Sequence, residues 1–245
     1  MEWKIGCSGY YYPEWKGNFY PAELPKSGWF EYYCRHFNTI ELNVTFYRFP
    51  RPEILASWYK RAPADFRFSV KAPRLITHFK KLKDSGKYLS DFYRAVAKGL
   101  REKASCVLFQ FPSNFQMDDE KLERLATILD PLFTNVVEFR HSSWWDEKVY
   151  RLLEKHHVIF SGMSHPELSD DIIKTGDIIY HRLHGVPHLY NSSYDLKSLE
   201  GINEKISGMS GVKAAYIFFN NTASGAAIAD GKHFAEITSA VSHGE

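Results

Sequence analysis

The sequence alternates between short β-rich runs and stretches with helical periodicity, and this alternation restricts the possible folds more than any other feature. Eight runs favour strands, at residues 4–8, 39–45, 66–71, 106–111, 135–140, 158–162, 178–184 and 215–220. Helical periodicity separates most of them, at residues 29–37, 53–61, 88–103, 119–129, 147–156, 196–207 and 232–241. The strand starts recur about every 30 residues, which is the repeat of an eight-fold β/α barrel of roughly 250 residues.

We therefore predict an α/β fold, a single irregular (β/α)8 TIM-like barrel that forms one domain over residues 1–245. The irregular unit is the sixth, because residues 163–176 leave room only for a short helix or a plain loop. A doubly wound sheet is the competing arrangement. It usually carries a glycine-rich turn, and the sequence contains neither GxGxxG nor GxxxxGK[ST].

Composition excludes several classes of protein. The 31 Lys and Arg nearly balance the 29 Asp and Glu, so the net charge of +2 excludes a polycation that holds nucleic acid by charge alone. The 16% aromatic content excludes a disordered chain. The sequence has no apolar run of about 18 residues and no signal-peptide pattern at its start, so we expect a cytoplasmic protein without a membrane partner.

The three cysteines, Cys7, Cys34 and Cys106, lie far apart and form no CxxC motif. Neither a disulfide framework nor a zinc site is indicated, and the HxH and HExxH spacings are also absent. We therefore expect no metal and no cofactor. The oligomeric state does not follow from the sequence.

Side chains alternate along a strand, so the parity of each run predicts which residues face the barrel interior. The apolar residues at 40, 42 and 44 should face the helices, as should those at 66, 68 and 70. The same parity leaves an unusually polar set facing inward, near the carboxyl ends of the strands where TIM barrels place their sites. This set comprises Glu41, Asn43, Lys71, Gln110, Glu138, Arg140, Arg182, His184 and Asn220.

Buried charges must be compensated, so we expect the two carboxylates of this set to pair with Lys71, Arg140 or Arg182. One lysine and two arginines against two glutamates leave a cationic surplus, which suits a phosphate or carboxylate ligand. His184 has the chemistry for proton transfer near neutral pH, with Glu41 and Glu138 as further catalytic candidates. The set predicts an enzyme that acts on a small anion by hydrolysis or elimination, a hydrolase or lyase; a purely structural network remains the alternative.

Three other chemistries stay open. A glycosidase would use Glu41 and Glu138 as its two carboxylates, although basic neighbours would keep both ionised. A Schiff-base enzyme would use Lys71. Metal-assisted hydrolysis would draw on the two glutamates, His184 and either His165 or Asp170.

A non-catalytic binder of nucleic acid or of a nucleotide is the alternative function. Aromatic residues crowd the segment SGYYYPEWKGNFYP, and such rings beside basic groups can stack on bases. Simple packing of this loop over the barrel explains them equally well. The aromatic candidates for ligand contact are Tyr10, Tyr12, Trp15, Tyr47 and Trp144.

Seven ordered blocks of the chain resemble the domain of unknown function 72 family, the YecE-like proteins. The blocks are IGCSGYYYPEWKGNFYP, FNTIELNVTFYRFP, FRFSVKAPRLITH, VLFQFPSNF, VVEFRHSSW, IIYHRLHG and YIFFNNTASGAA. The resemblance implies a TIM-barrel-like fold with these blocks at the carboxyl ends of the strands, and it brings no established activity. The block residues that it carries over are Ser8, Gly9, Trp15, Tyr20, Glu41, Asn43, Phe46, Tyr47, Lys71, Gln110, Pro112, Glu138, Arg140, Trp144, Arg182, His184, Gly185, Asn220 and Asn221.

Two departures from the family pattern matter. The first of the aromatic pair Tyr10 and Tyr12 is commonly Trp in the family. The family usually shows an Asp soon after the sixth strand, where this chain reads FSGMSHPELSDD. An acidic role at this place would pass to His165 or Asp170.

Overall fold

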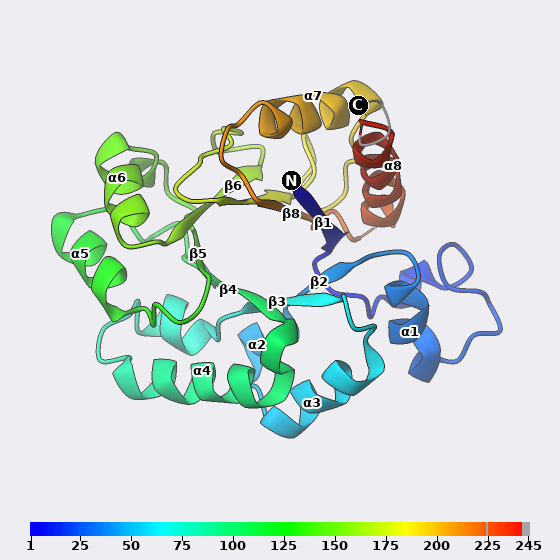
Figure 1. Cartoon of the computed structure of the whole chain (residues 1–245), viewed down its shortest axis with the longest axis horizontal. Coiled ribbons are helices and arrows are strands. Elements are labelled where there is room, and N and C mark those ends of the chain that lie inside the picture. Colours follow the sequence, from blue (N-terminus) through cyan, green and yellow to red (C-terminus); the bar gives the residue numbers. More distant parts are fainter. Residues whose placement is uncertain (224, 242–245) are drawn as a thin grey trace. The chain divides into compact units, whose positions relative to one another are not determined.

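The computed structural model describes residues 1–223 and 225–241. Its elements alternate between strands and helices along the chain (Figure 1). The strands are β1 (Glu2–Cys7), β2 (Thr39–Leu42), β3 (Arg67–Lys71), β4 (Ala104–Gln110), β5 (Asn135–Glu138), β6 (Ile159–Ser164), β7 (Ile178–Leu183) and β8 (Ala214–Phe219). The α-helices are α1 (Trp29–Cys34), α2 (Val44–Tyr47), α3 (Pro52–Arg61), α4 (Gly86–Leu100), α5 (Asp119–Ile128), α6 (Glu147–Lys155), α7 (Leu196–Ser207) and α8 (Ala226–Val241).

The strands join in one sheet with the order β1-β8-β7-β6-β5-β4-β3-β2. Pairing is parallel between β1 and β8, between β7 and β8, and along β3, β4, β5 and β6. Parallel neighbours in chain order, with the first strand paired to the last, give an α/β TIM-like barrel. The fold predicted from the sequence is thus confirmed. Of the two possibilities predicted between β6 and β7, a short helix or a plain loop, the described residues form the loop.

Two compact units divide the chain. The first unit comprises Met1–Ile40, Gly162–Ile172 and the chain from Asp177 onward, and the second comprises Glu41–Ser161 and Ile173–Gly176. Aromatic packing forms much of each core. In the first unit Tyr20 stacks on Trp29 with ring centroids 4.5 Å apart. In the second unit Phe139 stacks on Trp144 at 3.9 Å.

Capping residues explain where several helices begin. Asp118, Asp146 and Asp195 accept backbone N–H bonds at the first turns of α5, α6 and α7. Pro52 opens α3, where the first turn tolerates proline. In the second unit α3 and α4 run side by side (Figure 1), because Gly99 of α4 presents no side chain to α3.

The second strand is shorter than predicted. It ends at Leu42, and Val44–Tyr47 form the short helix α2. The prediction that Val44 packs against the helices is therefore wrong, because Val44 is 50% exposed. The next residue, Thr45, is buried, and its hydroxyl donates to the Lys71 carbonyl at 2.6 Å. Alternation fails here because the chain leaves the pleat immediately after Leu42.

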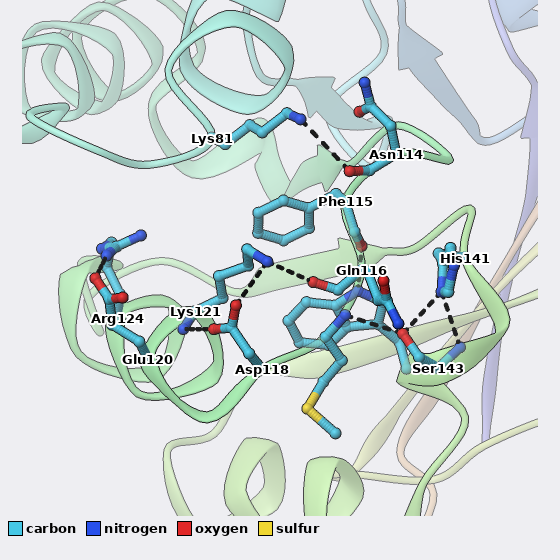
Figure 2. A network of polar contacts seen from close by, with 12 residues as sticks. Lys81, Asn114, Phe115, Gln116, Asp118, Glu120, Lys121, Arg124, His141 and Ser143 are labelled. Carbon is cyan, nitrogen blue, oxygen red and sulfur yellow. Dashed lines mark hydrogen bonds and ion pairs between the residues drawn. The ribbon is translucent and has the colours of Figure 1, made fainter.

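A polar network fixes the loops that follow β4 and β5 (Figure 2). Lys121 donates through Nζ to the Gln116 carbonyl at 2.8 Å and pairs with Asp118 at 2.7 Å. The Met117 backbone N–H donates to the Ser143 hydroxyl at 2.9 Å, which joins the two loops. Hydrogen bonds from side chains therefore satisfy backbone N–H and C=O groups in these loops, where the backbone has left the sheet and no neighbouring strand can pair with it.

Two of the three cysteines, Cys7 and Cys106, are buried. Burial raises the pKa of the Cys106 thiol to about 12, and burial also raises that of Cys7. Cys34 is half-buried at the end of α1. Among residues 1–223 and 225–241, no helix is long and apolar enough to cross a membrane.

Candidate functional site

Two groups of the predicted site residues are present, one in each unit. In the second unit Lys71, Gln110 and Glu138 end three neighbouring strands, β3, β4 and β5. The register places Gln110 directly opposite Glu138. These side chains therefore lie along one edge of the paired strands, the edge at which TIM barrels carry their sites.

An ion pair compensates the buried carboxylate of this edge. Arg140 donates through Nε to Glu138 at 2.8 Å, and the Glu138 side chain is completely buried whereas that of Arg140 is 13% exposed. A buried carboxylate without such a partner would be strongly destabilising. The predicted pairing of a glutamate with Arg140 is thus present.

Positive charge converges on His78 in the same unit. The pKa of His78 is lowered to about 4, first by burial and then by Lys71, Lys81, Arg140 and Arg74. Charge effects of this kind weaken with distance, so these four cations lie near the half-buried imidazole. We call Lys71, Arg74, His78, Lys81 and Arg140 the cationic cluster.

The loop between β3 and α4 builds this cluster with unusual backbone geometry. Residues Leu75–Phe79 form a π-helical turn that carries His78. Lys81, Leu82 and Asp84 all have positive φ, at 49°, 65° and 48°. Non-glycine residues in this region are strained, and both π-turns and such strain concentrate at functional sites.

Sequence reasoning missed Arg74, His78 and Lys81, because no periodic element covers residues 72–85. The available signal was the basic run KAPRLITHFKKLK directly after a strand. Thr77 fixes the His78 ring, since its hydroxyl lies 2.9 Å from Nδ1. Lys81 donates to the Asn114 carbonyl at 3.5 Å, which ties the cluster to the loop after β4 (Figure 2).

Two amides flank this edge. Asn43 follows β2, and its buried Oδ1 has no hydrogen-bond partner within the part of the chain that is described. Gln110 donates through Nε2 to the Phe111 carbonyl at 3.0 Å, and Glu41 is completely buried within β2. Asn43 is thus an acceptor available to a ligand hydroxyl or N–H group.

Trp144 lies inside the second unit rather than on its surface. Its indole N–H donates to the Phe115 carbonyl at 2.6 Å, and the ring is fully buried against Phe139. The side chain joins the loops that follow β4 and β5. Tyr47, in contrast, is 66% exposed on α2.

The predicted residues of the first unit form a buried chain of contacts. Arg182 lies 3.5 Å through Nη1 from His184 Nε2 and donates through Nη2 to the Ser8 hydroxyl at 3.5 Å. The Asn220 amide lies 2.7 Å from His184 Nδ1. Arg182 and His184 are at most 1% exposed, although β7 ends at Leu183.

Both ring nitrogens of His184 lie close to polar side chains. Nε2 faces the Arg182 guanidinium at 3.5 Å and Nδ1 faces the Asn220 amide at 2.7 Å, and the tautomer decides which ring nitrogen donates. Arg182 and Asn220 thus fix the orientation of the imidazole.

A second network positions the loop after β7. The Gly185 backbone, at φ 90°, donates to the Tyr194 hydroxyl at 2.9 Å, which in turn donates to Ser164 at 2.9 Å. Asp230 of α8 accepts from Asn221 at 2.7 Å, and burial raises the pKa of this carboxyl. The residues after His184 are therefore anchored to β6 and α8.

The aromatic N-terminal loop is tied to the backbone by its own polar atoms. Trp15 is fully buried and donates to the Thr222 carbonyl at 3.1 Å. Tyr12 and Tyr20 donate to the carbonyls of Ser8 and Tyr10, at 2.5 and 2.6 Å. Tyr10 and Tyr12 are half-buried. These contacts support packing as the role of the loop.

The alternative residues for a metal are also located. His165 is half-buried with its ring 5.9 Å from that of His184, and Asp170 is exposed in the segment after β6. Over residues 1–223 and 225–241, no three His, Cys, Asp or Glu side chains are grouped so that they could hold a metal ion.

Comparison with solved structures places this fold among known ones. A DUF72 family protein from Thermotoga maritima MSB8 shares 29% identity, with 98% of this chain and 100% of that chain covered at a TM-score of 0.89. A family 2 AP endonuclease from Brucella melitensis shares 12% identity over 96% of this chain and 98% of that one, at a TM-score of 0.56. The second likeness shows the fold alone.

Two curated proteins are also similar to this chain in sequence. YecE of Escherichia coli K12 is 32% identical over 118 residues, which span 47% of this chain and 42% of YecE. YunF of Bacillus subtilis 168 is 23% identical over 255 residues, covering 90% of each protein. The match with YecE thus spans less than half of that relative's length. The family model described as "Protein of unknown function DUF72" matches residues 4–243, and the chain belongs to this family.

Proposed function

We propose that the protein is an enzyme that acts on a small substrate bearing a phosphate or carboxylate, and that the cationic cluster binds this anionic group. The observation that carries the proposal is the convergence of four cations on His78 at the carboxyl end of β3. Arg140 is paired with Glu138, and Lys71, Arg74 and Lys81 bring three further positive charges near His78. His78, whose pKa is about 4, adds a neutral hydrogen-bonding group at pH 7.

Hydrolysis or elimination also requires proton transfer. Glu41 and Glu138 are the candidates for proton transfer within the second unit, and His184 is the candidate within the first. Arg182 and Asn220 hold the imidazole of His184 in one orientation.

Anion binding is tested by isothermal titration of the protein with inorganic phosphate. We expect Lys71→Ala and Lys81→Ala each to weaken binding about tenfold or more, because each removes a charge from the cluster. Lys98→Ala removes an exposed charge from α4 and serves as the matched control, with unchanged affinity expected. No phosphate binding by the unaltered protein, or equal loss in all three variants, would reject the anion site.

Turnover separates an enzyme from a non-catalytic binder. We expect a panel of phosphate esters to include one from which the protein releases phosphate, and His184→Gln to lower that rate by about 100-fold or more. The buried His184 makes folding a necessary check, so the variant is compared with the unaltered protein by circular dichroism. Phosphate binding without turnover of any ester would favour the binder.

A further inference from the structure

Exposed aromatic side chains adjoin the cationic cluster. Tyr47 of α2 is 66% exposed and Phe79 at the end of the π-turn is 69% exposed. The Arg74 guanidinium lies 5.9 Å from the ring centroid of Tyr47 and 5.4 Å from that of Phe79. We call Tyr47, Arg74 and Phe79 the aromatic platform.

Burial does not explain this platform. A ring that stays two-thirds exposed removes little apolar surface from water, so its packing contributes little to folding. Two exposed rings bridged by a planar guanidinium provide three flat faces on which a planar ligand can stack. Nucleobases are stacked in this way by proteins that bind single-stranded or free nucleotides.

Direct contacts join the platform to the anion site. Phe46 packs edge-on against Tyr47 at 5.1 Å and against His78 at 4.9 Å. The Lys71 ammonium lies 4.4 Å from the Phe46 ring centroid. Arg74 belongs to both groups. A planar group on the platform would therefore have any attached anion within reach of Lys71 and His78.

The geometry points to a nucleotide as the substrate class: its base stacks on the aromatic platform, and its phosphate binds the cationic cluster. This inference rests on the proposed function, because it uses the same anion site. All of the groups that it invokes lie in the second unit. It differs from the nucleotide binding expected of the N-terminal aromatic loop, which lies in the first unit.

The test compares three ligands that share a phosphate, by isothermal titration. Inorganic phosphate and ribose 5-phosphate lack a base, and adenosine monophosphate carries one. We expect adenosine monophosphate to bind at least about tenfold more tightly than ribose 5-phosphate, since each stacked base adds a favourable contact. In Tyr47→Leu/Phe79→Leu the two affinities become equal, while phosphate binding is unchanged.

Tyr59→Leu is the matched control. Tyr59 also has two cations over its ring, Arg101 at 5.3 Å and Lys103 at 4.6 Å, but it lies on α3 beside the residues that precede β4. The base preference should survive in this variant. Leucine retains the apolar volume at exposed positions, so the folded state is preserved in the platform variant.

The outcomes are distinguishable. If ribose 5-phosphate binds as tightly as adenosine monophosphate, or if the platform variant keeps the preference, the nucleotide inference fails while the anion site stands. If none of the three ligands binds, the proposed function itself fails. A single-stranded oligonucleotide serves as a further arm. If the oligonucleotide binds more tightly than adenosine monophosphate and the platform variant loses this difference, the natural ligand is a nucleotide within a single strand. If the oligonucleotide binds no more tightly, the natural ligand is a free nucleotide.

Discussion

At the scale of single residues, His78 makes stability depend on pH. Its pKa falls from 6.5 to about 4 on folding, so the unfolded chain binds more protons than the native protein between these values. The contribution of the neutral ring to the free energy of unfolding is fully present above pH 6.5 and is lost as the pH falls toward 4. After allowance for the half-exposed ring, the loss amounts to about 1 to 2 kcal/mol.

We therefore expect unfolding free energies of the unaltered protein and of His78→Asn, measured by urea denaturation, to differ in their pH dependence. The unaltered protein should lose more stability than the variant between pH 7 and pH 4. Parallel curves for the two proteins would contradict the assignment of a neutral His78.

The buried pair of Glu138 and Arg140 gives a second prediction at this scale. Arg140→Met leaves the completely buried carboxylate without its guanidinium, so we expect a loss of about 3 to 5 kcal/mol in unfolding free energy. Adding Glu138→Gln should restore part of that loss because the buried charge is removed. Additive losses in this double-mutant cycle would show that the pair is not coupled.

At the scale of elements, the packing of α3 against α4 depends on Gly99. A Cβ at this position would lie 2.4 Å from the Leu55 Cβ and 2.9 Å from the Pro52 carbonyl oxygen. Alanine favours a helix over glycine by about 1 kcal/mol, but overpacking of this kind costs about 1 to 3 kcal/mol, so the clash should dominate. We expect Gly99→Ala to destabilise the protein in thermal unfolding.

Gly201 provides the opposite case within α7. No atom lies within 4 Å of a Cβ at this position, so Gly201→Ala should raise the unfolding free energy by up to about 1 kcal/mol. Stabilisation by both substitutions would mean that α3 and α4 have room to move apart.

Elements with a clear period are also those that the sequence predicts well. α7 was expected at 196–207 and spans those residues, and β7 and β8 end within one residue of their expected ends. The sequence did not predict the π-turn at Leu75–Phe79 or the left-handed backbone conformation of Lys81. No glycine marks this strained backbone, so its geometry follows from tertiary contacts that local sequence does not record.

The residues of the candidate site also differ in how well the sequence predicts them. Lys71 and Arg140 were predicted because strand parity and strand ends locate them. Arg74, His78 and Lys81 lie in a loop without a period, and only the fold brings them beside the strand residues. Sequence reasoning therefore names the candidates that lie on strands or directly after them, and it does not reach those of the loop.

At the scale of the whole molecule, the net charge of +2 conceals a local concentration of positive charge in the second unit. Phosphate binding should then weaken with salt, by about tenfold between 50 and 500 mM NaCl, as exposed charges are screened. Titration at both concentrations measures this change. An affinity independent of salt would indicate that hydrogen bonds rather than charge hold the anion.

The unequal burial of the three cysteines makes the chain suitable for site-specific spectroscopy. Thiols react as thiolates, and the raised pKa values of Cys7 and Cys106 suppress that form. A maleimide dye should therefore attach to the half-buried Cys34 of α1 without prior substitution of the other two. Folded protein would carry one fluorophore, and its emission would report on the first unit while nucleotides are titrated into the second.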